Sequence, residues 1–278
     1  MSCSASSQIV EAGWSMHAII TGGSSGIGLE IARLCILNGY DVSLVARDEN
    51  ALRNACENLR QVGPGRVNAV SADVRRMDLL LEVFEQCELG FGVCDLLITS
   101  AGVVEPAFFE ELVPSHFELQ MDINFSGTVN AVRAIYAGMK SRDRGNIMMI
   151  SSAAAFIGIP GYSAYCASKA ALAAFAESLR SEVGAGIYIG ISFPPDTCTP
   201  QLQNELPKRP PLAKALMGDT SPWSVDAVAR QIFDGISHRR PEVHFGLKLK
   251  VLAMLGSFIK PVLYWQLKRS VSLHARKC

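Results

Sequence analysis

Short runs of mainly apolar residues alternate with amphipathic stretches along most of the chain. The apolar runs predict buried strands over residues 16–21, 41–46, 66–72, 95–99, 145–151 and 187–193. Between them, helical spacing of apolar residues predicts helices over residues 29–38, 49–61, 78–87, 114–140 and 163–182. This alternation predicts an α/β fold, a Rossmann-type doubly wound parallel sheet with helices on both faces.

The chain has 278 residues, enough to bury one large core, and it contains no internal repeat, low-complexity tract or linker. We therefore expect a single domain over residues 16–246. Residues 1–15 form a tail that has neither a basic start nor a long apolar stretch. Neither a signal peptide nor a membrane anchor is expected in this tail.

Composition narrows the possible functions. Lys+Arg and Asp+Glu both number 26, so no overall charge attracts nucleic acid, and we expect no nucleic-acid partner. The 8 cysteines include no Cys-x-x-Cys pair, and the 5 histidines show no His-Glu-x-x-His spacing. We therefore expect no metal site and no disulfide framework, and reduced thiols in a cytoplasmic setting.

The first apolar run is followed by a glycine-rich turn and then by a helix. Glycines in such a turn let the backbone approach a pyrophosphate closely, at a helix N-terminus where free N–H groups favour anions. A plain Gly-Ser loop is the alternative, but the strand before it and the helix after it favour dinucleotide binding. The turn residues expected to bind are Gly22, Ser24, Ser25, Gly26, Ile27 and Gly28.

Tyr165 and Lys169 lie four positions apart, on one face of the helix predicted over 163–182. A lysine ammonium beside a phenol favours the phenolate, lowers the phenol pKa and permits general acid-base catalysis. The alternative is an ordinary exposed pair of side chains. Cys166 beside Tyr165 is interpreted as a small buried thiol rather than a nucleophile.

The spacing Thr21-Gly22-x-x-x-Gly26-x-Gly28, followed downstream by Tyr165 and Lys169, resembles the short-chain dehydrogenase/reductase family. The resemblance implies that Ser152 binds the substrate oxygen and that Asn124 interrupts a long helix and holds a proton-relay water. It also implies Tyr165 as the proton donor. The further cofactor contacts that it implies are Asp73, Val74, Ala101, Gly102, Tyr165, Lys169, Pro194, Thr197 and Thr199. An ordinary helix or turn cap is the alternative role for Asp73.

Two positions modify this resemblance. Thr99-Ser100 replaces the two asparagines of the family's Asn-Asn-Ala-Gly segment, which puts one local hydrogen bond in doubt. At the end of the second strand, Arg47 favours NADP(H), because an arginine accommodates the ribose 2′-phosphate. Asp48 follows immediately and is the alternative, since an acid there binds the 2′-hydroxyl of NAD.

The segment from Pro194-Pro195 to Pro200 narrows the expected substrate. It is similar to the 3-ketodihydrosphingosine reductases of sphingolipid synthesis, where most family members have Pro-Gly. The expected reaction is NADPH-dependent reduction of a ketone on a long-chain lipid, 3-ketosphinganine to sphinganine. The alternatives are a 3-ketoacyl chain, a steroid or another apolar ketone as substrate, and a non-catalytic NADP-binding regulatory protein. Residues 200–223 are expected to form a substrate lid.

Residues 247–278 are apolar, aromatic and basic, with Lys260 and Pro261 interrupting them before a membrane-spanning length is reached. We expect this segment to lie on a bilayer, with Tyr264 and Trp265 at the interface. A helix that completes the substrate pocket or a subunit interface is the alternative. The expected location is therefore cytoplasmic, peripheral on the cytosolic face of a membrane. The expected assembly is a homo-oligomer, either a dimer or a tetramer.

Overall fold

The fold is built on one seven-stranded sheet. The computed structural model describes residues 15–218 and 221–275, with side chains described as far as residue 265, so the predicted tail lies outside it apart from Ser15. Every paired strand is parallel, in the order β3-β2-β1-β4-β5-β6-β7. The strands are β1 His17–Thr21, β2 Asp41–Ala46, β3 Val67–Ser71, β4 Cys94–Thr99, β5 Gly145–Ile150, β6 Ile187–Phe193 and β7 Glu242–His244.

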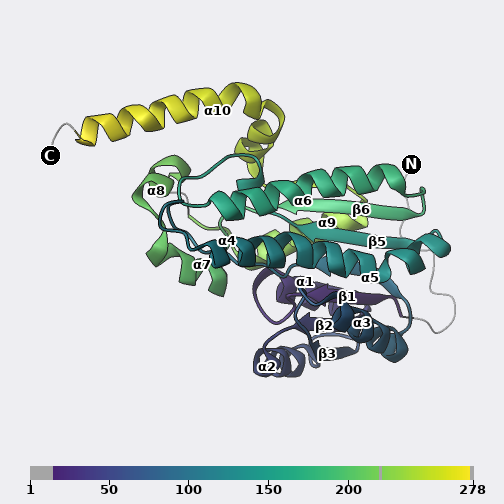
Figure 1. The fold of residues 1–278 in the computed structure, drawn as a ribbon. Coiled ribbons are helices and arrows are strands. Elements are labelled where there is room, and N and C mark those ends of the chain that lie inside the picture. Colours follow the sequence, from purple (N-terminus) through teal and green to yellow (C-terminus); the bar gives the residue numbers. More distant parts are fainter. Residues whose placement is uncertain (1–14, 219–220, 276–278) are drawn as a thin grey trace.

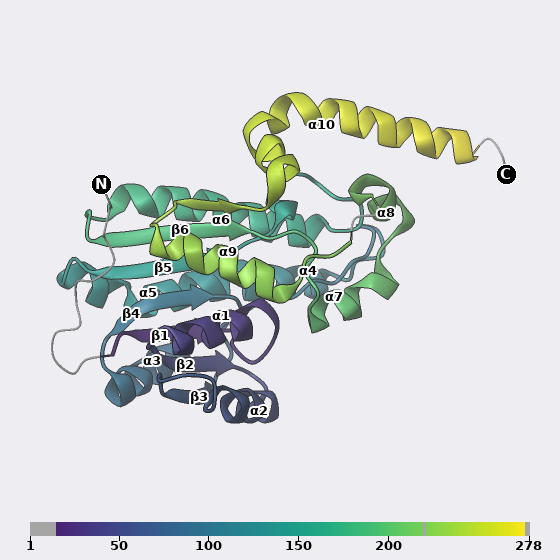
Figure 2. The same cartoon turned by 180° about the vertical axis from the view of Figure 1, so that it is seen from behind.

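Helices cover both faces of this sheet. The helices are α1 Gly26–Leu37, α2 Glu49–Leu59, α3 Met77–Phe91, α4 Pro114–Met121, α5 Gly127–Ser141, α6 Ser163–Glu182, α7 Pro200–Glu205, α8 Pro211–Met217, α9 Val225–Ser237 and α10 Gly246–Ala275. One core packs α1, α2 and α9 against the sheet, and a second packs α3, α5 and α6 against the other face. Figure 1 shows α5 and α6 on the near face, and Figure 2 shows α9 on the opposite one.

Neighbouring residues of β1 show why the strands are near-continuously apolar. Ile20 belongs to the first core and Ile19 to the second, so successive side chains are buried on opposite faces. The predicted fold class is confirmed. The strand order reverses direction at β1, between β2 and β4, and in such sheets ligands bind outside the carboxyl ends of the strands at this point.

The helix predicted over 114–140 is divided. A single π-helical turn, Asp122–Ser126, separates α4 from α5 and contains Asn124. Such turns occur as local irregularities in helices, frequently at functional sites. Beyond residue 193 the structure adds α9 and β7, for which the sequence pattern led to no prediction.

The C-terminal helix α10 is bent rather than straight. Leu255 has non-helical dihedral angles, φ −115° and ψ 15°, and Pro261 lies in the following portion. The first part of α10 rises from the end of β7, and the second part turns across the molecule towards α8 (Figures 1 and 2). Among the described residues, no helix combines the length and apolar character needed to cross a bilayer.

Candidate active site

The glycine turn packs tightly against the loop that follows β4. Gly22 and Gly26 have φ values of +68° and +57°, a region that side chains other than glycine rarely adopt. A Cβ on Gly22 would lie 2.6 Å from the backbone nitrogen of Ala101, and one on Gly28 would lie 2.5 Å from the carbonyl oxygen of Gly22. The turn can therefore present only backbone at this point, which suits the close approach of a pyrophosphate.

Helix α1 begins directly after this turn. Its N-cap residue, Ser25, makes no side-chain capping hydrogen bond, and its first turn contains no acidic residue. The first backbone N–H groups of α1 are therefore available to an anionic ligand. These features fit the phosphates of a dinucleotide.

One cavity of about 1190 Å³ joins the glycine turn to the other predicted site residues. The predicted residues that line it are Gly22, Ser24, Ser25, Gly26, Ile27, Arg47, Asp73, Val74, Ala101, Gly102, Ser152, Tyr165, Lys169, Pro194, Thr197 and Thr199. Gly28 and Asn124 do not line it. Gly28 instead packs against Gly22, and Asn124 lies beneath the cavity wall.

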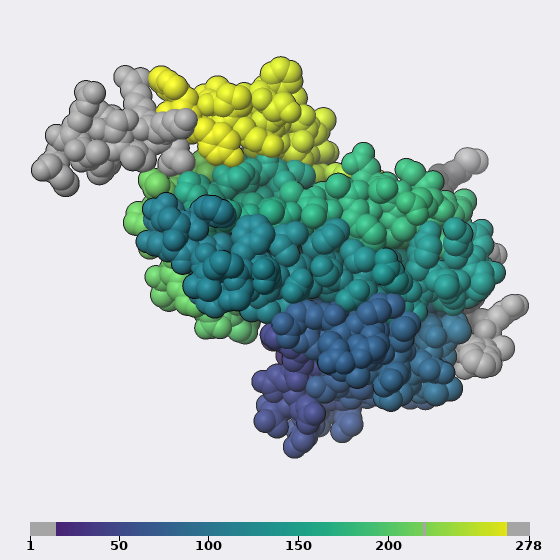
Figure 3. All heavy atoms as spheres, viewed as in Figure 1, coloured from purple at the N-terminus to yellow at the C-terminus, as the bar shows by residue number. Residues whose placement is uncertain are grey.

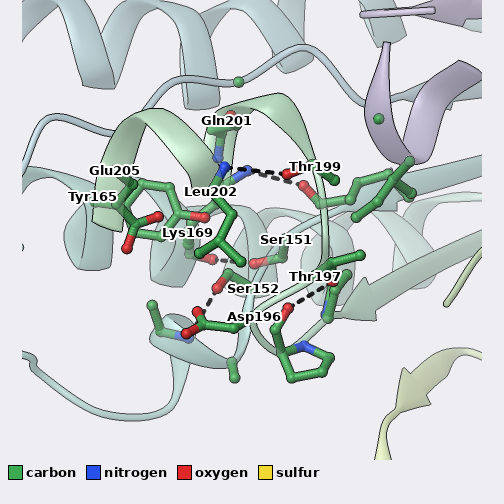
Figure 4. A pocket seen from close by; sticks show the side chains of 18 of the residues that line it. Ser151, Ser152, Tyr165, Lys169, Asp196, Thr197, Thr199, Gln201, Leu202 and Glu205 are labelled. Atoms are coloured by element: carbon green, nitrogen blue, oxygen red, sulfur yellow. Dashed lines mark hydrogen bonds between the residues drawn. The ribbon is translucent and has the colours of Figure 1, made fainter. Parts of the chain in front are cut away.

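Ser152, Tyr165 and Lys169 meet where β5 ends beside α6 (Figure 4). Lys169 is buried, its Nζ donates to the carbonyl oxygen of Ile150 at 3.0 Å, and it lies 5.7 Å from the centre of the Tyr165 ring. Ser151 ties the strand to the helix, because its hydroxyl donates to the carbonyl oxygen of Lys169 at 2.9 Å. Ser152 accepts a hydrogen bond from the backbone nitrogen of Ala154 at 3.2 Å.

Burial sets the protonation of this pair. It lowers the pKa of Lys169 to about 8 and raises the pKa of Tyr165 above its usual value, while a hydrogen bond with Ser152 opposes the latter shift. The lowered phenol pKa expected from the neighbouring lysine is therefore not found, because burial disfavours the phenolate more strongly. Tyr165 is a protonated phenol at neutral pH, the form that can donate a proton.

Asn124 is fully buried in the π-helical turn. Its Oδ1 accepts from the backbone nitrogen of Val103 at 2.8 Å, and its Nδ2 donates to the carbonyl oxygen of Val103 at 2.9 Å and to the Ser168 hydroxyl at 3.0 Å. These bonds fix the segment after Gly102 against α6. A solvent-facing asparagine is thereby excluded, while the proton-relay water stays a prediction.

Arg47 and Asp48 differ in their engagement at the end of β2. The Asp48 carboxylate caps α2, accepting from the backbone nitrogens of Asn50 and Ala51 at 2.9 and 3.0 Å. Arg47 and Asp48 are both exposed, and both line the cavity. The structure thus gives Asp48 a capping role through Oδ1, and the contact of either residue with the cofactor ribose stays a prediction.

Asp73 also has partners within the protein. Its carboxylate pairs with the guanidinium of Arg75, with 2.6 Å between Oδ2 and Nη2, and accepts from the Arg75 backbone nitrogen at 3.0 Å. Hydrogen bonding to Arg75 lowers the pKa of Asp73. The turn role considered from the sequence is present, and a contact with adenine stays a prediction. The Thr99 hydroxyl is buried and has no hydrogen-bond partner among the described residues.

The segment after β6 is held by backbone hydrogen bonds to the end of the predicted lid. Trp223 donates its backbone N–H to the carbonyl of Asp196 at 2.9 Å and accepts from the backbone nitrogen of Cys198 at 2.8 Å. Thr197 donates its hydroxyl to the Pro195 carbonyl at 2.8 Å, and Thr199 caps α7. Between them α7 and α8 border the cavity, and the 3-10 turn Leu206–Lys208 follows α7.

A polar network that the sequence gave no means of anticipating lies beside Tyr165. Arg209 donates to Asp196 Oδ2 and Glu205 Oε1, both at 2.6 Å, and to the Tyr162 hydroxyl at 3.2 Å. Tyr162 in turn donates to Glu205 Oε1 at 2.6 Å. Asp196, Glu205 and Tyr162 line the cavity.

Helix α10 forms the far wall of the cavity with Leu249, Leu252, Ile259 and Leu263. The Tyr264 hydroxyl anchors it by donating to the carbonyl of Gly158 at 3.0 Å and accepting from the nitrogen of Gly158 at 2.9 Å. The Tyr264 hydroxyl therefore bonds to the protein, and the position of this side chain at a bilayer interface stays a prediction. The space-filling view shows α10, in yellow, lying over the edge of the molecule formed by α6 (Figure 3).

No other reactive centre is found in the described part of the chain. It contains no group of three or more His, Cys, Asp or Glu side chains that could hold a metal ion. Cys166 is partly buried, and burial raises its thiol pKa, which disfavours the nucleophilic thiolate.

Residues 16–210 match the family model described as short chain dehydrogenase. The chain belongs to this family. A structure described as a short chain dehydrogenase/reductase family protein superimposes with a TM-score of 0.72 at 28% identity, covering 83% of this chain and 95% of that one. A second, from Burkholderia phymatum in complex with NAD, has a TM-score of 0.74 at 24% identity over 83% and 89% of the two chains, which supports the fold.

Curated relatives match the chain over more than 200 residues. The chain is 37% identical over 224 residues to a 3-dehydrosphinganine reductase of Arabidopsis thaliana, covering 79% of this chain and 66% of the relative. It is 39% identical over 210 residues to a 3-dehydrosphinganine reductase of Danio rerio, covering 74% and 63%. The chain thus spans about two thirds of the length of these relatives.

Proposed function

We propose that this protein reduces a ketone on a long-chain lipid with NADPH, and that the substrate is 3-ketosphinganine. The observation that carries the proposal is the continuity of the cavity. It runs from Arg47 and the glycine turn, past Ser152 and Tyr165, to the apolar side chains of α10. A dinucleotide, a carbonyl group and an alkyl chain can therefore occupy one connected space.

Each of these cavity residues would have a distinct role in such a reduction. The turn after β1 and the N-terminus of α1 bind the phosphates, and NADPH, when bound, supplies the hydride. Ser152 donates a hydrogen bond to the carbonyl oxygen and stabilises the negative charge that develops there. Tyr165 donates its proton to that oxygen, and the Lys169 ammonium stabilises the phenolate that remains. Asn124 maintains the path that returns a proton to Tyr165.

The choice of NADPH rests on Arg47. A guanidinium forms charge-assisted hydrogen bonds with a phosphate, and Arg47 is exposed at the edge of the cavity where β2 ends. Asp48, the acid that would favour NAD, accepts two backbone hydrogen bonds at the start of α2. Both bonds end on Oδ1 and commit Asp48 to capping α2, although Asp48 also lines the cavity, and we therefore favour Arg47 as the residue that contacts the ribose.

The choice of a long-chain substrate rests on the apolar part of the cavity and on the relatives. Leu216 and Met217 of α8 and Leu249, Leu252 and Leu263 of α10 give that part an aliphatic lining. An alkyl chain buried there gains about 0.8 kcal/mol for each methylene group removed from water. The reductases of plants and fish that resemble the chain are named for 3-dehydrosphinganine.

A steroid is the second candidate substrate. The chain is 35% identical over 177 residues to 11-beta-hydroxysteroid dehydrogenase 1A of Arabidopsis thaliana. A 3-ketoacyl chain is a further alternative substrate. A non-catalytic NADP-binding role would not require Ser152, Tyr165 and Lys169 to lie together, and we therefore disfavour it.

Membrane association and self-assembly are part of the proposal. Leu247, Met254 and Phe258 are 76, 73 and 80% exposed on α10, close to the exposed Lys248 and Lys250. Apolar and basic side chains together bind an anionic bilayer surface. The protein would then act peripherally on the cytosolic face of a membrane, as a dimer or tetramer.

NADPH oxidation measured against matched ketones tests this function. We expect turnover with 3-ketosphinganine and slower turnover with a steroid ketone or a 3-ketoacyl thioester of similar size. Turnover confined to the steroid, or absent with every ketone while NADPH binds, contradicts the proposal.

A further inference from the structure

The network around Arg209 brings more negative than positive charge to the catalytic end of the cavity. The side chain of Arg209 is 6% exposed and that of Glu205 is 10% exposed. Asp196 is the second carboxylate on the same guanidinium. One cation and two carboxylates leave a net negative charge in a setting where charge is costly to bury without a partner.

Lys208 and Lys169 are bonded to other groups, and the remaining lysine that lines the cavity, Lys248, belongs to α10. Lys208 pairs with Glu105 on the outer side of the lid segment, at 2.8 Å. Lys169 directs its ammonium to the carbonyl of Ile150. Of the described cations, Arg209 is the one bonded to both Asp196 and Glu205.

The hydrogen bonds leave one oxygen of each carboxylate unused. Both bonds to Glu205 end on Oε1, and the bond to Asp196 ends on Oδ2. No described residue donates to Glu205 Oε2 or Asp196 Oδ1. Asp196 and Glu205 both line the cavity, and neither of these oxygens is among the fully buried atoms that lack a partner. Each carboxylate therefore keeps one oxygen that a ligand in the cavity could use.

Both carboxylates act on the catalytic phenol. The negative charges of Glu205 and Asp196 each contribute to the raised pKa of Tyr165. In the close-up, the labelled Asp196 and Glu205 side chains belong to the same pocket as Ser152 and Tyr165 (Figure 4). A positively charged group bound to these oxygens would lie next to a carbonyl held by Ser152 and Tyr165.

We propose that Asp196 and Glu205 bind the protonated amine of the substrate, which is an α-amino ketone. This inference rests on the proposed function and goes beyond it by assigning the residues that select the head of the substrate. In 3-ketosphinganine the amine is carried by the carbon next to the carbonyl. A carbonyl bonded to Ser152 and Tyr165 therefore brings the ammonium to the two carboxylates, where it can form charge-assisted hydrogen bonds. Arg209 is a positioning residue that holds both of them.

The competing explanation is that the network only anchors the lid. Arg209 joins the segment after β6, through Asp196, to α7, through Glu205, and to Tyr162 at the start of α6. An anchor serves every substrate equally, whereas an ammonium site serves only substrates that carry an amine. The two roles therefore differ in their dependence on substrate.

The test compares 3-ketosphinganine with the same ketone carrying hydrogen in place of the amine. In the wild-type protein we expect kcat/KM to be higher for the amino ketone. For Glu205→Gln and Asp196→Asn we expect that value to fall about tenfold to a hundredfold, mainly through KM, because hydrogen bonds to charged groups contribute on that scale. Reduction of the deamino ketone should change little. Glu105→Gln, which removes an equal charge from the outer ion pair, is the matched control and should leave both ketones unaffected.

Each outcome has a distinct meaning. Equal losses on both ketones would assign the network to lid anchoring and overturn the ammonium site. A wild-type protein that reduces both ketones equally well would overturn the inference and leave the reductase function intact, and this comparison needs no variant. Reduction of neither ketone would contradict the proposed function and this inference with it. NADPH binding by each variant shows that it is folded.

Discussion

Replacing Arg47 with leucine tests the assignment of the cofactor. Arg47 lies at the end of β2, lines the cavity and is exposed. Leucine keeps much of the aliphatic stem and removes the guanidinium. NADPH and NADH differ only in the 2′-phosphate, so any contact of Arg47 with that phosphate is lost for NADPH alone.

The magnitude follows from the exposure of the guanidinium. Hydrogen bonds to charged groups contribute about 1.5 to 3 kcal/mol, and about 1.4 kcal/mol corresponds to a tenfold change in Kd. Because Arg47 is exposed, solvent and salt screen the contact and the lower end of this range applies. We expect the Kd for NADPH to rise about tenfold and the Kd for NADH to stay nearly constant.

Isothermal titration calorimetry with each cofactor measures both constants. Arg53→Leu is the matched control, since Arg53 is an exposed arginine of α2 that does not line the cavity. The NADPH affinity of the wild-type protein should also weaken with added salt more than that of Arg47→Leu. Equal losses for NADPH and NADH, or no loss for either, would refute the role of Arg47.

Three further predictions concern other parts of the account. We expect kcat/KM for ketone reduction to fall as pH rises through about 8. Burial lowers the pKa of Lys169 to about 8, and above that pH the neutral amine no longer stabilises the phenolate. A profile flat to pH 10 would contradict this role of Lys169. Since Asp48 caps α2, Asp48→Ala should lower the free energy of unfolding by about 1 kcal/mol in a denaturant titration. The preference for NADPH over NADH should stay unchanged. A selective loss of NADH affinity would instead assign Asp48 as a ribose ligand. Replacing the exposed Met254 and Phe258 with glutamine should reduce co-sedimentation with anionic liposomes and preserve turnover of a short soluble ketone. Deletion of residues 247–278 should lower both quantities, because it also removes the α10 side chains that line the cavity. Unchanged sedimentation of the double variant would assign the exposed face of α10 to another role.

The fold was predictable because its signals are local. Parallel strands buried on both faces produce continuous apolar runs, and the turn after β1 needs glycine at Gly22 for its positive φ and its contact with Ala101. Helix α9 carries a comparable signal, since Val228, Ile232 and Ile236 recur at helical spacing and are buried. Strand β7 has only three residues, too few for a periodic pattern.

The sequence identified the candidate catalytic residues Ser152, Tyr165 and Lys169, which the structure brings to one cavity, but it did not predict their environment. The pKa of Tyr165 depends on burial and on carboxylates brought to it from other segments. The bond from Arg209 to Tyr162 joins residues 47 positions apart, and no local periodicity records such a pair. The anchor between Tyr264 and Gly158 spans 106 positions, and with it one side of α10 lines the cavity while Met254 and Phe258 stay exposed.

The transfer of hydride from the cofactor to 3-ketosphinganine tests the central claim most directly. NADPH carrying deuterium at the transferring position of the nicotinamide should label the carbon that bore the ketone, and mass spectrometry should detect sphinganine with one deuterium. Tyr165→Phe, which lacks the proton donor, should bind NADPH and form this product at least about a hundredfold more slowly. Unlabelled product, no product, or an unchanged rate in Tyr165→Phe would contradict the account.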